Sequence, residues 1–88
     1  MKYMKIVDRI KVEIELPEHG YTVLRYELIA SEEGEHWGLS CSLEATGESA
    51  AAEDVTSVRS EAEDIMKRMA AGTVTPVSFY DILYDLLP

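Results

Sequence analysis

Apolar and polar side chains alternate along residues 4–16, and this pattern restricts the fold more than any other feature of the sequence. Successive side chains of a β-strand point to opposite faces, so a period of two over this length predicts a strand with one buried face. The alternation is broken once, because Asp8 stands on the apolar side of the pattern and Val7 on the polar side. We therefore expect a β-bulge or a break near residues 7–9.

Two further segments, 21–30 and 37–45, have the composition and alternation of strands. Turn-forming residues at 17–20 and 31–34 separate the three segments from one another. Consecutive strands joined by such short turns predict an antiparallel meander. Residues 46–54 are small, polar and acidic, and we expect them to form a loop.

After residue 55 the period of the apolar pattern changes from two to about 3.6, which predicts two helices. The apolar stripe of the first helix comprises Val58, Ala62, Ile65, Met66 and Met69. The stripe of the second helix comprises Phe79, Ile82, Leu83 and Leu86. The few residues between the two stripes imply helices that fold back near one another.

Residues typical of helix ends lie on either side of these stripes. Ser57 and Ser60 are both candidate N-caps of the first helix, and Ser60 with Glu63 has the spacing of a capping box. Gly72 is expected to end that helix. Thr75-Pro76 predicts the start of the second helix, with threonine as the cap and proline in the first turn.

Together these elements predict one α+β domain with a three- to four-stranded antiparallel meander and two C-terminal helices packed on one face. Its expected parts are the β meander (1–45), an acidic loop (46–54) and a helical pair (55–88). A chain of 88 residues is too short to divide into two domains with separate cores.

The formal net charge of −9 is concentrated in the middle of the chain. Residues 29–66 hold ten acidic residues and one basic residue, Arg59, whereas the segments on either side each balance to zero. Such a field repels phosphate, so we expect neither nucleic-acid binding nor attachment to an anionic membrane. No apolar run is long enough to span a bilayer, and one cysteine cannot form an internal disulfide. A cytoplasmic location is therefore expected.

Residues with catalytic or metal-binding chemistry are few and scattered. Cys41, the single thiol, falls on the inward side of its strand, where a free cysteine is usually a small core residue. His19 and His36 flank turns and have no partner at ligand spacing. Asp81 and Asp85 lie one helical turn apart and opposite the apolar stripe, which indicates a solvated face. We therefore predict no catalytic residue, no metal site and no cofactor.

The acidic middle segment and nearby aromatic residues define a candidate interaction surface. Its members are Glu32, Glu33, Glu35, Trp37, Glu53, Asp54, Tyr80 and Tyr84. The predicted function is a non-enzymatic protein-interaction or accessory domain, whose partner is a basic protein surface or a second copy of the chain. The alternative is a small-ligand-binding protein or minor enzyme with a pocket between sheet and helices, near Trp37, Cys41 and Tyr80.

Three stretches of the C-terminal half form a pattern that is found elsewhere. They are Val55-Thr56-Ser57, a helix with Ile65, Met66 and Met69, and the run Thr75-Pro76-Val77-Ser78-Phe79-Tyr80-Asp81-Ile82-Leu83-Tyr84-Asp85-Leu86-Leu87. In this pattern the chain resembles a family of small proteins of unknown function from clostridia and related Firmicutes. That family commonly has histidine at the position of Ser78 and a Phe-like residue at that of Leu86. The resemblance implies a cytoplasmic bacterial protein and supplies no activity or site residue.

Overall fold

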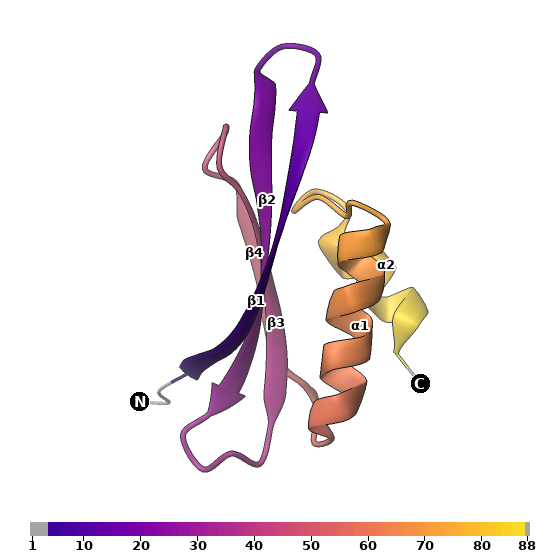
Figure 1. The fold of residues 1–88 in the computed structure, drawn as a ribbon. Helices are drawn as coiled ribbons and strands as arrows, with labels where there is room; N and C mark the ends of the chain where they lie inside the picture. Colours follow the sequence, from indigo (N-terminus) through magenta and orange to yellow (C-terminus); the bar gives the residue numbers. More distant parts are fainter. Residues whose placement is uncertain (1–3, 88) are drawn as a thin grey trace.

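The computed structural model describes residues 4–87, which form one four-stranded sheet and two helices (Figure 1). The strands are β1 (Met4–Leu16), β2 (Gly20–Ser31), β3 (Trp37–Leu43) and β4 (Ser49–Thr56), and the helices are α1 (Arg59–Ala71) and α2 (Phe79–Leu86). Both helices lie on one side of the sheet, which confirms the predicted α+β architecture. Within the described residues, no helix is both long and apolar enough to cross a membrane.

The strands follow the order β1-β2-β3-β4, and each neighbouring pair is antiparallel. The predicted meander is therefore confirmed, with four strands. The pairing of β1 with β2 shifts between Ile6 and Asp8, so the predicted bulge is also present. Because of this bulge Val7 packs against the core, whereas Ile6 is half exposed.

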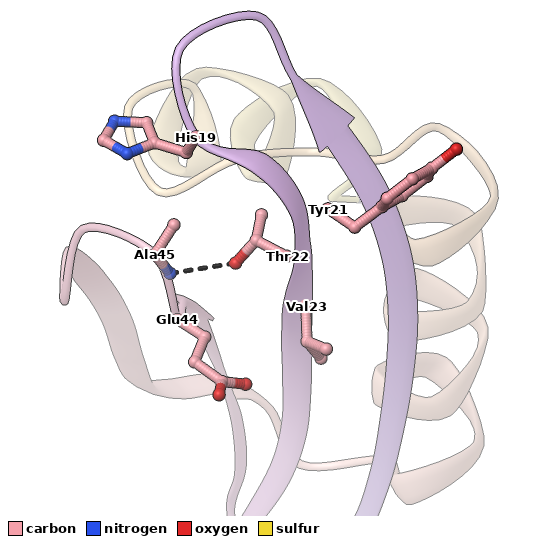
Figure 2. A pocket seen from close by; sticks show the side chains of 6 residues that line it. All are labelled: His19, Tyr21, Thr22, Val23, Glu44 and Ala45. Atoms are coloured by element: carbon pink, nitrogen blue, oxygen red, sulfur yellow. Dashed lines mark hydrogen bonds between the residues drawn. The ribbon is translucent and has the colours of Figure 1, made fainter.

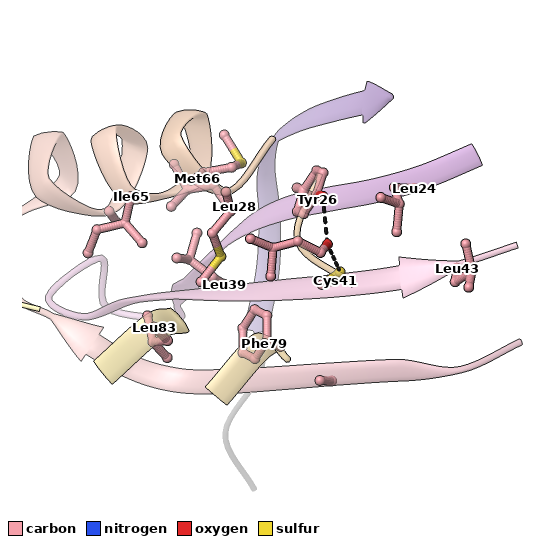
Figure 3. Close-up of a cluster of buried hydrophobic side chains, with 14 residues drawn as sticks. Leu24, Tyr26, Leu28, Leu39, Cys41, Leu43, Ile65, Met66, Phe79 and Leu83 are labelled. Atoms are coloured by element: carbon pink, nitrogen blue, oxygen red, sulfur yellow. Dashed lines mark hydrogen bonds between the residues drawn. The ribbon is translucent and has the colours of Figure 1, made fainter. Parts of the chain in front are cut away.

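The core fills the space between the sheet and the helices (Figure 3). The two central strands contribute Leu24, Tyr26, Leu28, Leu39, Cys41 and Leu43, and the helices contribute Ala62, Ile65, Met66, Met69, Phe79 and Leu83. The apolar residues of β1 that face the helices, among them Ile10, Val12 and Ile14, are only partly buried. Their position explains the difference, because β1 is the first strand of the sheet and has a neighbour on one side only.

The expected loop at residues 46–54 is wrong, because most of it belongs to β4. Only residues 44–48 turn, with the Leu43 N–H donating to the Glu48 carbonyl at 2.9 Å and Gly47 at φ +74°. Alanine, glutamate and aspartate are disfavoured in strands, and for this reason the segment resembles a loop in sequence. Pairing with β3 overrides that preference, and it places Ala50 in the core opposite Cys41.

The predicted serine caps of α1 are also wrong, including the capping box at Ser60. The helix begins at Arg59, and its N-cap residue, Val58, makes no side-chain cap hydrogen bond. Thr56, the last residue of β4, contacts the start of the helix instead. Its hydroxyl accepts the Val58 N–H at 3.0 Å and donates to the Glu61 carboxylate at 2.7 Å.

The second helix begins later than expected. The prediction of Thr75 as the cap is wrong, because residues 75–78 form a turn in which the Ser78 N–H donates to the Thr75 carbonyl at 3.1 Å. The helix then starts at Phe79. Proline sets its own φ but does not by itself continue a helix, so Pro76 is equally suited to this turn. Gly72 is confirmed as the C-cap of α1.

Gly38 allows β4 to cross close to β3. Trp37 pairs with Thr56 and Leu39 pairs with Ala52, so β4 has extra residues in a bulge opposite this glycine. A Cβ atom on Gly38 would run into the Ala52 carbonyl oxygen and would lie 2.5 Å from the Glu53 carbonyl oxygen. Both obstacles are backbone atoms, which cannot move aside as a flexible side chain can.

We therefore expect Gly38→Ala to lower the free energy of unfolding by about 1–3 kcal/mol, the usual cost of overpacking a closed site. Urea denaturation followed by circular dichroism measures this loss. Gly72→Ala is the matched control, because the nearest atom to its added Cβ is 3.5 Å away and the change should be small. Equal stability of the two variants would contradict the close approach of β4 to β3.

Candidate functional site

Cys41 and Tyr26 meet at one backbone oxygen inside the core. The two residues are paired across β2 and β3, and the exposed fraction is 0% for Cys41 and 1% for Tyr26. The Tyr26 hydroxyl donates to the Val74 carbonyl at 2.6 Å, and the Cys41 thiol contacts the same oxygen at 3.4 Å (Figure 3). The structural interpretation of Cys41 fits this position, since the thiol is closed off from solvent.

Burial also sets the protonation of both groups. It raises the pKa of the Cys41 thiol from its ordinary value of 9.0 to about 11. Burial, with a smaller contribution from the Cys41 thiolate, also raises the pKa of Tyr26. A thiol nucleophile needs the opposite change, because the thiolate is the reactive form.

Five predicted surface acids lie at one end of the sheet, and we call this set the acidic end. Its members are Glu32, Glu33, Glu35, Glu53 and Asp54, and all five are exposed. Three of them belong to the turn between β2 and β3, and two belong to the bulged part of β4. Antiparallel pairing of β3 with β4 brings these segments together, because the residue after the turn, Trp37, pairs with Thr56.

A histidine joins the two segments of the acidic end. The His36 Nδ1 atom lies 3.1 Å from an Asp54 carboxylate oxygen, and both side chains are partly exposed. The sequence does not predict this pair, because it indicates only that His36 flanks a turn. The separation of the two residues in the sequence does not predict the contact, because the contact depends on the register of β3 with β4.

The three aromatic candidates have different environments. Trp37 is half-buried and packs against the edge of the core. The Tyr80 hydroxyl donates to the Ala51 carbonyl at 2.9 Å and accepts its N–H at 3.4 Å, so this side chain is bound to the outer edge of β4. Tyr84 is 72% exposed. Only Trp37 adjoins the acidic end along the chain.

The remaining candidates show no converging chemistry. Asp81 and Asp85 are exposed on α2, in agreement with a solvated face. His19 is exposed in the turn between β1 and β2, at the opposite end of β2 from His36. Across residues 4–87, no three His, Cys, Asp or Glu side chains are grouped closely enough to hold a metal ion.

Two of the concavities on the surface of the described residues lie away from the expected pocket near Cys41 and Tyr80. The larger, of about 440 Å³, lies between the β1–β2 hairpin and the turn that follows β3 (Figure 2). It is lined by His19, Tyr21, Thr22, Val23, Glu44 and Ala45. The Thr22 hydroxyl accepts the Ala45 N–H at 2.9 Å and ties its two walls together. The smaller, of about 150 Å³, lies between α1 and Leu86.

The raised pKa of the Cys41 thiol predicts how the free energy of unfolding changes at alkaline pH. The unfolded chain loses the Cys41 proton near pH 9 and the folded chain near pH 11, so the free energy of unfolding should fall as the pH rises through this interval. The contribution is at most about 1.4 kcal/mol per pH unit. Urea titrations at several pH values should show a shallower fall for Cys41→Ala than for the wild-type chain.

A thiol reagent provides the independent check. At pH 8 Cys41 should stay unmodified in the folded protein and react fully once urea unfolds it, because both burial and the neutral thiol suppress attack. Rapid modification of the folded protein would show that the thiol is accessible and that the assignment to the core is wrong.

One comparison with known proteins gives a match that covers nearly the whole of this fold. A scan against protein-family models matches residues 3–88 to the family described as "Family of unknown function (DUF6514)". The match includes the strands as well as the C-terminal half on which the resemblance in sequence rests. Searches of curated proteins and of solved structures found no match. The chain, from β1 to the end of α2, belongs to the family of unknown function DUF6514.

Proposed function

We propose that the protein is a non-enzymatic interaction domain whose acidic end binds a basic segment of another protein. One observation carries the proposal. Exposed carboxylates from two separate segments gather at the acidic end, and within residues 4–87 none of them is ion-paired with lysine or arginine. An unneutralised group of like charges attracts cations and steers the approach of a basic partner.

The arginines of the protein are occupied elsewhere. Arg9 pairs with Glu27 at 2.6 Å, Arg59 pairs with Glu63 at 2.9 Å, and Arg68 pairs with Asp64 at 2.9 Å. Arg25 lies 4.0 Å from Glu44, close to the opposite end of the sheet. Lys5, opposite Ala30 and near the β2–β3 turn, is exposed and forms no ion pair with these acids in the described residues. Basic side chains of a partner are therefore suitable counterions for the acidic end.

Trp37 adds a second kind of contact. It is the first residue of β3, directly after the acidic turn, and it is only half-buried. The face of an indole ring attracts lysine and arginine side chains. Carboxylates beside an accessible aromatic ring favour a lysine- or arginine-rich segment over a neutral one.

The proposal includes a cytoplasmic setting in a bacterium of the clostridial group. The single thiol supports it, because a protein stabilised without disulfides is suited to a reducing compartment. The resemblance of the C-terminal half points to the same group of organisms.

A short polylysine peptide is a direct probe of the acidic end. The triple variant Glu32→Lys, Glu33→Lys, Glu35→Lys should weaken its binding about tenfold or more, since three exposed charge pairs of about 0.2–1 kcal/mol each are lost and replaced by repulsion. Trp37 is the single tryptophan and adjoins the site, so its fluorescence reports the titration. Binding of the wild-type chain should weaken as salt is raised.

A second triple variant controls for net charge. Glu18→Lys, Glu48→Lys, Asp85→Lys changes the charge by the same amount at exposed positions outside the acidic end. It should weaken polylysine binding by no more than about threefold, because its charges act only from a distance. If both triple variants lose the same affinity, binding follows overall charge and the acidic end is not a site.

A further inference from the structure

The two edges of the sheet differ in how their backbone groups are satisfied. At the β4 edge the Tyr80 hydroxyl binds both the N–H and the carbonyl of Ala51. At the other edge β1 pairs only with β2, and both helices lie on one face of the sheet (Figure 1). The outer side of β1 therefore has no partner strand, and its backbone N–H and carbonyl groups form a template for another strand. One of these N–H groups is already bonded, because Arg9 donates its N–H to the Asp8 carboxylate at 2.8 Å.

The regular part of this edge has defined limits. The bulge between Ile6 and Asp8 interrupts the strand at one end. Pro17, which has no N–H, follows the strand at the other end. The uninterrupted segment is 8–16, and its middle residue is Val12.

We propose that two copies of the chain pair through this segment, antiparallel and centred on Val12, to form a dimer with one continuous eight-stranded sheet. The two-fold axis then passes between Val12 and Val12 of the second copy. A symmetric contact of this kind uses the same surface twice, so every pair across it occurs in duplicate. The inference concerns β1 and is independent of the function proposed for the acidic end.

Charge complementarity selects this register. With Val12 opposite Val12, Lys11 faces Glu13 of the second copy, so opposite charges meet on both sides of the axis. Arg9 faces Glu15 and adds a weaker attraction, because its guanidinium is already paired with Glu27. Lys11, Glu13 and Glu15 are exposed and form no ion pair within the described chain. Lys11 lies opposite Arg25 on β2, a like-charge neighbour that a glutamate on its other side would offset.

The neighbouring registers are less favourable. Moving the axis to Lys11 places two lysines opposite one another, and moving it to Glu13 places two glutamates opposite one another. Like charges directly opposite on antiparallel strands are destabilising. With the axis at Val12, the basic residues of β1 in one copy face the acidic residues of β1 in the other.

The apolar side of β1 supports the same pairing. Ile10, Val12 and Ile14 face the helices and remain only partly buried in one copy. In the proposed register Ile10 lies opposite Ile14 of the second copy, and the two Val12 side chains meet at the axis. A row of apolar side chains then continues from one core toward the other, which removes apolar surface from water.

Charge exchange tests the proposal. Sedimentation equilibrium of the wild-type protein over a dilution series should show a dimer. Lys11→Glu or Glu13→Lys alone should raise the dissociation constant about tenfold or more, because each creates two like-charge pairs in the symmetric contact. The double variant Lys11→Glu, Glu13→Lys restores opposite charges and should restore the dimer. A monomeric wild-type protein, or a dimer indifferent to either single variant, overturns the proposal.

Disulfide trapping tests the register separately. Val12→Cys should form a disulfide between two copies under mild oxidation, because the new thiols meet at the axis, whereas buried Cys41 stays out of the reaction. Ile14→Cys is the matched control on the same face of the same strand. It should cross-link poorly, since its partner in the register is Ile10. Equally fast cross-linking of both variants would overturn the centre at Val12.

These measurements also separate the dimer from the proposed function. The exchanged residues lie on β1, and the acids of the probe-binding test lie on the β2–β3 turn. Loss of the dimer with unchanged polylysine binding leaves the acidic end intact. Loss of polylysine binding in the acidic-end variant should leave the dissociation constant of the dimer unchanged.

Discussion

The hydrogen bond from Tyr26 to the carbonyl of Val74 holds the helical layer in place over the sheet. Val74 lies in the connection between α1 and α2, and its carbonyl oxygen also accepts a hydrogen bond from the thiol of Cys41 on β3. A buried carbonyl without a partner is costly, so this connection has little freedom to move while both strands keep their register. The start of α2 lies only a few residues after Val74, so this anchor also fixes where the helix begins. It thereby positions the Phe79 side chain in the core and the Tyr80 side chain at the edge of β4.

Local sequence patterns predicted the parts of this fold that depend on neighbouring residues. Alternation along β1 gave its buried face and its bulge, and Gly72 gave the end of α1. Residues 49–56 could not be predicted in the same way, because alanine and acidic residues form a strand there only when β3 is beside them. The start of α1 was missed for a related reason, since the contacts there come from Thr56 at the end of β4, whose hydroxyl bonds the Val58 N–H and the Glu61 carboxylate.

Sequence composition predicted which segment is acidic, and the structure shows which of its acidic residues lie together. The concentration of acids between residues 29 and 66 was evident from the chain, but the meeting of Glu53 and Asp54 with the β2–β3 turn depends on long-range pairing. Tyr80 shows the limit of the approach. Its place beside the core stripe suggested a binding aromatic, whereas its hydroxyl is engaged with the backbone of β4. This contact with Ala51 is structural, and the spacing of residues in the sequence does not predict it.

The hydroxyl of Tyr80 also bears on how far a sheet of this kind can grow. Strand addition repeats indefinitely when both edges of a sheet accept a new strand, and fibres arise in this way. Here the outer N–H and carbonyl of Ala51 are already bonded, and the adjacent residues of β4 are bulged. A sheet doubled through β1 would end in β4 on both sides. Assembly would then stop at two subunits, and the same tyrosine that completes the monomer would keep the protein from polymerising.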